Sequence, residues 1–271
     1  MKSRSEVSDQ ALASKERFSH FAERDVALLK WRFGCGYMAE LEKGRYRRMF
    51  AGAKRILDVG CGLGEAARYA EGADYFGIDL SEVLVRRGQN HLDRILAVAS
   101  ADALPFPNQT FDRVTCMGLL HHLPRGQIPL VLKEMTRVLK PGGGLVLVEA
   151  NPWSLYARLM AYLRPAESGI LNTSPAHLRR VIESLRVLKV EEFDYDHTMF
   201  WPSYGTFFLR RWSWPTGPRM TAWLITLHKW MTRLTPGPLR FQTFWRLRKR
   251  AERETPHPKN RPLKEREEET C

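Results

Sequence analysis

Short apolar runs alternate with helical patterns through the middle of the chain. The runs are rich in β-branched and other apolar residues, and they predict strands near 55–59, 74–79, 94–98, 111–116 and 144–149. The segments between them predict helices. Strands that alternate with helices build a mostly parallel sheet with helices on both faces. The pattern therefore predicts an α/β fold with a Rossmann-like, doubly wound sheet.

Helical patterns also flank this centre on both sides. Ser174 followed by Pro175 is a favourable helix start. Segments rich in proline and glycine, 215–218 and 235–238, lie on either side of a helical pattern over 219–234. We expect helices over 5–33, 36–50, 155–163, 175–185, 219–234 and 239–252. Residues 187–195 are expected to form a sixth strand.

A turn with three glycines follows the first strand. Gly60, Gly62 and Gly64 can adopt positive φ angles and let a ligand approach the backbone. The start of the helix expected next favours a carboxylate or phosphate. Asp79, at the end of the second strand, can accept hydrogen bonds from both hydroxyls of a ribose. The motif therefore predicts a site for a nucleoside-bearing cofactor.

The spacing of the glycines narrows the choice of cofactor. A dinucleotide site has the pattern G-x-G-x-x-G, whereas this turn has G-x-G-x-G and places Glu65 at the position of the third glycine. A carboxylate there is unfavourable for a pyrophosphate. The stretch resembles motif I of the class I S-adenosylmethionine-dependent methyltransferases, in which an acid, here Asp58, precedes the glycines.

Later motifs follow the order of the same family. Asp102 and Asp112 stand where its third and fourth strands are expected, and the His121-His122 pair and a strand ending at Glu149 come after them. The matched region covers about 52–152. It is similar to the branch of ubiquinone- and menaquinone-pathway methyltransferases and small-molecule methyltransferases. The resemblance implies an antiparallel seventh strand, for which 206–211 is the nearest candidate.

The resemblance also implies S-adenosylmethionine as cofactor, S-adenosylhomocysteine as product and no metal. In that family the leading acid holds the amino group of the cofactor, the glycine turn lies under its methionine moiety, and two later acids hold the ribose and the adenine amino group. The cofactor residues implied here are Asp58, Gly60, Gly62, Gly64, Asp79, Leu80, Asp102, Ala103 and Met117.

Candidate acceptor-binding residues lie before the first strand and after the fifth. Helices before the first strand commonly form a lid in this family, so Trp31, Tyr37 and Tyr46 are candidates for the acceptor wall, with packing on the sheet as the alternative. Glu149 could hold an acceptor hydroxyl or amine, or instead cap a helix or pair with a basic side chain.

The adjacent histidines follow the fourth strand, at the sheet edge where α/β folds bind ligands. His121 or His122 could act as general base, because imidazole accepts a proton near neutral pH. The alternative is that both only shape the pocket. Adjacent side chains point in different directions, so the pair by itself predicts no metal site.

Basic residues and tryptophans are concentrated near the C-terminus. The net charge is +13, and residues 197–251 contain ten Lys or Arg and no Asp or Glu. The segment 212–254 could rest on an anionic membrane surface, contact a nucleic acid, or cap the core or a second subunit of a homodimer. We consider nucleic acid the least favoured partner, because Trp223 and Trp230 share one helix face.

The chain is thus expected to have a helical lid (1–51), a methyltransferase core (52–211), a basic Trp-rich helical extension (212–254) and a disordered tail (255–271). Four scattered cysteines and the absence of a signal-peptide pattern favour the cytoplasm, with peripheral attachment to the inner membrane face as an option.

The function expected is SN2 transfer of a methyl group to O, N or C of a lipophilic or aromatic small molecule, such as a quinone precursor, isoprenoid, lipid or natural product. The alternatives are an RNA methyltransferase and a non-catalytic S-adenosylmethionine-binding protein that is recruited to a membrane or protein partner.

Overall fold

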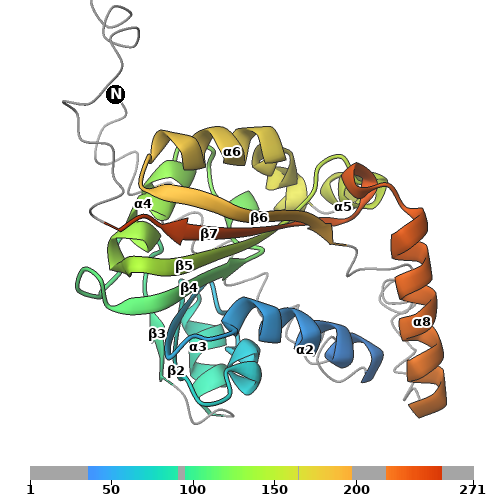
Figure 1. Cartoon of the computed structure of the whole chain (residues 1–271), viewed down its shortest axis with the longest axis horizontal. Coiled ribbons are helices and arrows are strands. Elements are labelled where there is room, and N and C mark those ends of the chain that lie inside the picture. The colour runs from blue at the N-terminus through green and yellow to red at the C-terminus, as the bar shows by residue number, and fades with distance from the viewer. Residues whose placement is uncertain (1–35, 91–94, 164, 197–217, 252–271) are drawn as a thin grey trace, which may run out of the picture.

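A seven-stranded sheet forms the centre of the molecule (Figure 1). The computed structural model describes residues 36–90, 95–163, 165–196 and 218–251. The strands are β1 (Arg55–Val59), β2 (Asp74–Asp79), β3 (Ile95–Val98), β4 (Phe111–Met117), β5 (Leu139–Ala150), β6 (Leu188–Asp196) and β7 (Gln242–Lys249). Their order is β3-β2-β1-β4-β5-β7-β6, and only β7 runs antiparallel to its neighbours. The α/β fold with one antiparallel strand is confirmed.

Helices cover both faces of this sheet (Figure 1). They are α2 (Gly36–Phe50), α3 (Glu82–Gln89), α4 (Ile128–Val138), α5 (Leu155–Leu163), α6 (Pro175–Ser184) and α8 (Pro218–Leu234), with short 3-10 helices η1 (Glu65–Tyr69), η2 (Leu120–His122), η3 (Pro165–Thr173) and η4 (Gly237–Leu239). Figure 1 shows α4 and α6 on one face and α2 and α3 on the other.

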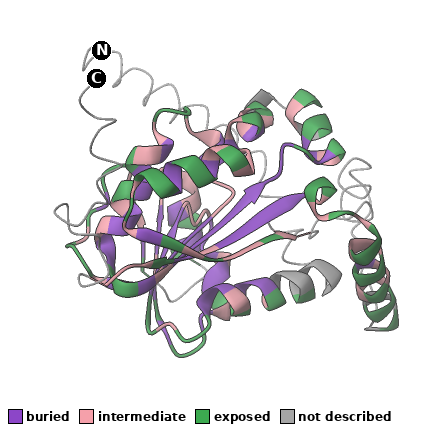
Figure 2. Ribbon diagram, turned by 45° about the horizontal axis from the view of Figure 1, so that its top comes forward, coloured by how far each residue is buried: buried purple, intermediate pink, exposed green. Residues whose placement is uncertain are grey.

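Buried residues are concentrated in the central strands (Figure 2), and alternation along these strands divides the core into two layers. Leu57 packs in the layer under α4 and α6, whereas its neighbour Ile56 packs in the layer under α2. The same division separates Trp245 from Phe244 on β7. Successive strand residues point to opposite faces, so a strand buried on both sides is apolar at every position.

Most of the expected elements are confirmed. The helices expected over 36–50 and 155–163 have the observed bounds of α2 and α5, and strands β1 and β2 match their predicted ranges. Ser174 caps α6, because its side-chain oxygen accepts a hydrogen bond from the backbone N–H of His177.

The helix expected over 239–252 is wrong. Gln242–Lys249 instead forms β7, which lies between β5 and β6. Its apolar residues fit a helix face and a strand equally well. The unpaired edges of β5 and β6 decide between the two, because an isolated helix could not satisfy their backbone groups.

This strand changes the domain boundaries. Helix α8 lies between β6 and β7 in the chain and is not part of an extension that follows the core. The sheet therefore includes part of the segment 212–254, which the sequence predicts as a helical extension. The other strand candidate, 206–211, the helix over 5–33 and the tail 255–271 lie outside the described residues.

Replacing a buried side chain of β7 tests its place in the sheet. Trp245 is fully buried, and its ring centroid lies 4.2 Å from that of Phe193. Trp245→Ala is expected to lower the free energy of unfolding by about 3–5 kcal/mol, because it removes a large aromatic contact area. Urea unfolding followed by circular dichroism measures the change. Arg248→Ala, on an exposed position of the same strand, is the control; equal effects of the two substitutions would contradict this assignment.

Candidate active site

The glycine turn closes the carboxyl end of β1. Gly60, Gly62 and Gly64 have φ angles of 77°, 58° and 69°, a region that side chains with a Cβ rarely adopt. The backbone N–H of Gly60 donates to the carbonyl of Ile78 at 2.8 Å, which ties the turn to β2. A Cβ on Gly60 would lie 3.1 Å from the Cβ of Leu119. The turn after β1 and the turn after β4 therefore face each other closely.

The segment after the turn differs from expectation. Gly64 precedes η1, a 3-10 helix of five residues. So short a helix has few aligned peptide dipoles, and the regular helix expected to start here is not observed. Glu65, at the start of η1, pairs with Arg68, its carboxylate 2.6 Å from the guanidinium Nε.

Asp79 at the end of β2 holds the turn in place. Its Oδ2 accepts a hydrogen bond from the backbone N–H of Gly62 at 2.8 Å, and its Oδ1 accepts one from Ser81 at 2.9 Å. Burial raises the pKa of this carboxyl, and the backbone hydrogen bonds oppose the rise. The side chain remains partly exposed at the edge of the sheet.

Asp58 lies deeper, in the strand itself. Its Oδ2 accepts a hydrogen bond from the hydroxyl of Tyr75 at 2.6 Å, and its Oδ1 accepts one from Thr115 at 2.9 Å. Burial raises the pKa of Asp58 to about 6; the two hydroxyls lower it, and repulsion from Asp79 raises it further. At neutral pH the turn thus contains an ionised, desolvated acid.

The charge of Asp58 predicts a pH-dependent stability. Its pKa is raised from 3.8 to about 6 in the folded protein, so the folded state binds this proton more tightly than the unfolded state does. Ionisation therefore destabilises the fold as the pH rises from about 4 to about 6, and the loss reaches about 3 kcal/mol above that range. Asp58→Asn is neutral at every pH. We expect the stability of the variant relative to wild type to increase from pH 5 to pH 8.

Thermal and urea unfolding of both proteins at pH 5, 6, 7 and 8 measures this difference. A difference that stays constant over that range would show that Asp58 does not titrate there. The absolute stability of either protein is not the readout, since other groups also titrate.

The remaining cofactor candidates lie at the same edge of the sheet. Asp102 and Ala103 are exposed in the turn after β3, and the Ser100 hydroxyl donates to Asp102 at 2.5 Å. Leu80 follows β2 and Met117 ends β4, both partly exposed. The sheet therefore brings the predicted cofactor residues of the four strands together.

His121 is held between two glutamates. Its Nδ1 lies 2.7 Å from Oε2 of Glu149, and its Nε2 lies 3.2 Å from Oε2 of Glu167. Burial lowers the pKa of His121, but the two glutamates overcome this effect and raise it to about 9. In the protein as it stands, His121 keeps its proton at neutral pH and is unsuited to act as a free general base.

Glu149 does not face an acceptor. Its side chain is fully buried, and Oε1 accepts hydrogen bonds from the backbone N–H groups of Leu119 and Leu120 at 3.1 and 2.7 Å. The role of Glu149 as an acceptor ligand is therefore wrong in this structure. The other interpretation, a residue that caps a helical turn and pairs with a basic side chain, matches these contacts.

The lid candidates have different outcomes. Tyr46 is buried in the core, where its ring stacks on that of Tyr69 with centroids 5.2 Å apart, so packing is its observed role and the acceptor-wall prediction is wrong here. Tyr37 belongs to α2, but its side chain is outside the described set, and Trp31 lies outside the described residues.

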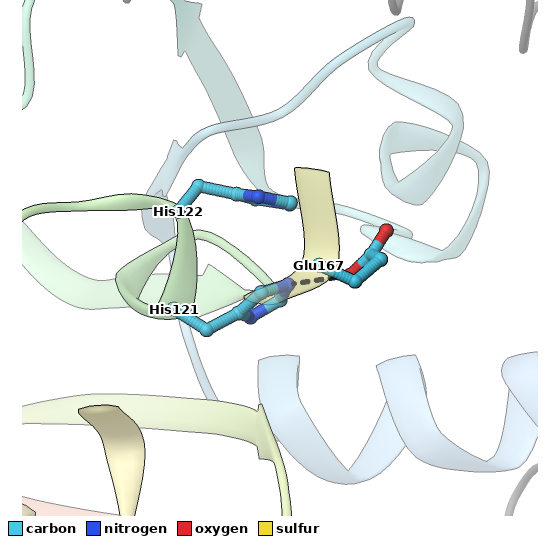
Figure 3. A group of neighbouring side chains, drawn as sticks. All are labelled: His121, His122 and Glu167. Carbon is cyan, nitrogen blue, oxygen red and sulfur yellow. Dashed lines mark hydrogen bonds and ion pairs between the residues drawn. The ribbon is translucent and has the colours of Figure 1, made fainter. Parts of the chain in front are cut away.

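Glu167 was not anticipated from the sequence. It lies on η3, 46 residues after His121, in a segment whose pattern predicts only a loop. No local spacing connects it to the histidines. His122 lies beside His121 with ring centroids 4.0 Å apart, and the donor atoms of His121, His122 and Glu167 lie within 4.8 Å of one another (Figure 3).

Comparison with known proteins supports a methyltransferase domain. Residues 56–143 match the family described as "Methyltransferase domain". A demethylmenaquinone methyltransferase from Symbiobacterium thermophilum is 37% identical over 122 residues, covering 40% of this chain and 48% of that protein. A fatty-acid O-methyltransferase from Mycolicibacterium smegmatis is 37% identical over 106 residues, covering 36% and 38%. The matched segments thus span less than half the length of these relatives.

A solved structure supports the fold over a longer range. The S-adenosylmethionine-dependent methyltransferase from Archaeoglobus fulgidus superposes with a TM-score of 0.56 at 21% sequence identity, covering 83% of this chain and 99% of that one. At this identity the likeness concerns the fold alone.

Proposed function

We propose that this chain, which carries a class I S-adenosylmethionine-dependent methyltransferase domain, transfers the methyl group of that cofactor to a lipophilic or aromatic small molecule. One observation carries the proposal: the glycine turn after β1 is flanked by the buried Asp58 and the partly exposed Asp79, and it faces the turn after β4. This is the switch point of the sheet, where strand order reverses and ligands bind.

The charge of the turn supports a cationic cofactor. Asp58 and Asp79 repel each other there, whereas the carboxylate of Glu65 is paired with Arg68. A pyrophosphate would increase that repulsion, whereas the amino group and sulfonium of S-adenosylmethionine would reduce it. In our proposal Asp79 binds the ribose hydroxyls and Asp102 binds the adenine amino group. Asp58 interacts with the amino group of the methionine moiety.

The reaction depends more on alignment of the acceptor with the methyl donor than on activation of that donor. The sulfonium is already a good leaving group, so the protein positions an acceptor nucleophile in line with the methyl–sulfur bond and excludes water. The turn with Leu119, His121 and His122 lies opposite the glycine turn, and we assign acceptor activation to it. S-adenosylhomocysteine leaves as product.

The acceptor class is inferred from the surroundings and the relatives. Leu80, Met117 and Leu119 offer partly exposed apolar surface at this edge. The two relatives named above act on a demethylmenaquinone and on a fatty acid, as their names state. Both acceptors are lipophilic.

Cofactor binding to the full chain tests the assignment directly. Calorimetry with S-adenosylmethionine is expected to show one site. Asp79→Asn should weaken binding at least about tenfold, because it removes a charged acceptor of hydrogen bonds. Asp74→Asn, at the exposed opposite end of the same strand, is the matched control. A wild-type chain that binds no cofactor would refute the proposal, and an unchanged affinity of Asp79→Asn would refute the ribose assignment.

We also propose that an anionic membrane surface presents the acceptor. Large apolar side chains are exposed on α5, α8 and the turn before α5: Trp153, Leu155, Leu159, Tyr162, Trp223, Trp230 and Leu234. Arg219, Lys229 and Arg233 are exposed on α8. Aromatic residues beside cations on one helix are typical of interfacial attachment. None of the helices in the described part of the chain is long and apolar enough to cross a membrane.

Flotation with liposomes tests this attachment. The double substitution Trp223→Ser/Trp230→Ser should reduce binding to vesicles containing phosphatidylserine by at least about fivefold, since each ring contributes buried apolar area. Leu130→Ser is the control, because Leu130 is 54% exposed on α4. Equal flotation of wild type and the double variant would refute the membrane proposal, and retention of RNA by wild type alone would favour the nucleic-acid alternative.

A further inference from the structure

We propose that His121, His122 and Glu167 bind a divalent transition-metal ion, with zinc as the ion that fits the ligands best. The inference deepens the proposed function, and rests on it for the role of the metal in methyl transfer. Figure 3 shows the two imidazoles, from η2, and the carboxylate, from η3, converging on one region. Two imidazoles and one carboxylate are the protein ligands of many catalytic zinc sites.

The distances between the donor atoms agree with a shared ion. Two ligand atoms bound to a tetrahedral zinc ion at about 2.1 Å each lie about 3.4 Å apart. Nε2 of His121 and Oε2 of Glu167 are 3.2 Å apart. The nitrogen of His122 lies within 4.8 Å of both, and its partly exposed side chain can close that gap by rotating.

A buried carboxylate orients one of the ligands. Glu149 binds Nδ1 of His121 at 2.7 Å and leaves Nε2 directed at Glu167. Metal-binding histidines usually have such a partner on the nitrogen that does not bind the metal, because it fixes the ring and increases its basicity. Glu149 would therefore act as a positioning residue.

A glycine allows η3 to approach the histidine turn. A Cβ on Gly169 would lie 1.8 Å from the backbone carbonyl oxygen of His121, far inside any real contact. Only glycine permits this approach, which brings Glu167, two residues earlier, to the imidazole. The close approach of η2 and η3 is thus built into their backbones, and only the partly exposed side chains of His122 and Glu167 need to adjust around the ion.

The metal would supply the activation of the acceptor. Three protein ligands leave a position open for an acceptor hydroxyl, whose pKa falls on binding to zinc. The hydroxyl proton passes to solvent, the oxygen forms a bond to the methyl carbon, and the methyl–sulfur bond breaks with its electron pair staying on sulfur. The products are the methyl ether or ester and S-adenosylhomocysteine. The site therefore points to an oxygen nucleophile.

Zinc calorimetry on the chelator-stripped full chain tests the site. One zinc ion per chain is expected, and the cobalt-substituted protein should show the visible absorption of a four- or five-coordinate ion. His122→Ala and Glu167→Gln should each weaken zinc binding at least tenfold. His177→Ala and Glu183→Gln, on α6, replace the same residue types outside the cluster and should leave zinc binding unchanged.

Two further measurements complete the test. X-ray absorption at the zinc edge should show imidazole and carboxylate ligands in the wild-type protein. This result does not depend on whether the variants fold. Gly169→Ala should lose zinc binding and keep binding of S-adenosylmethionine. Failure of wild type to bind zinc, or equal binding by the variants and wild type, overturns the metal site. Failure to bind S-adenosylmethionine overturns the proposed function instead, and the two titrations on one preparation separate these outcomes.

Discussion

The buried carboxylate of Glu149 is the interaction on which the arrangement of the site depends. It lies fully inside the protein at the end of β5 and binds two backbone N–H groups and one imidazole of the turn after β4. A charge so far from water is tolerable only with such partners. The turn is therefore fixed to the strand beside it. Because the same turn lies against the glycine turn after β1, this carboxylate helps to fix the spacing between the two turns.

The parts of the fold that were predicted from the sequence depend on local signals. Strand β1, the three glycines and Asp79 lie within 25 residues of one another, and each has a short-range physical reason for its conformation. Ser174 and Pro175 likewise define the start of α6 by themselves. These elements could be located without knowing anything about the rest of the chain.

The missed features depend on distant partners. Phe244 and Trp245 are compatible with a helix or a strand, and only the edges of β5 and β6, up to about a hundred residues earlier, select the strand. Glu167 has no recognisable spacing from His121, since η3 reaches it through a tertiary approach. Glu149 could be recognised from the sequence as a functional candidate, but the direction in which its side chain points could not. A sequence shows which groups are present more readily than it shows where each one points.

The repulsion between Asp58 and Asp79 has a consequence for the life of the protein in a cell. Their carboxylates place negative charge where water is largely excluded, and a cationic ligand would relieve that repulsion. A ligand that binds only the folded chain increases its resistance to unfolding in proportion to the logarithm of the free ligand concentration. Unfolded chains are the substrate of cellular proteases. The amount of this protein would then follow the supply of its methyl donor, rising when the donor is plentiful and declining by degradation when it is scarce.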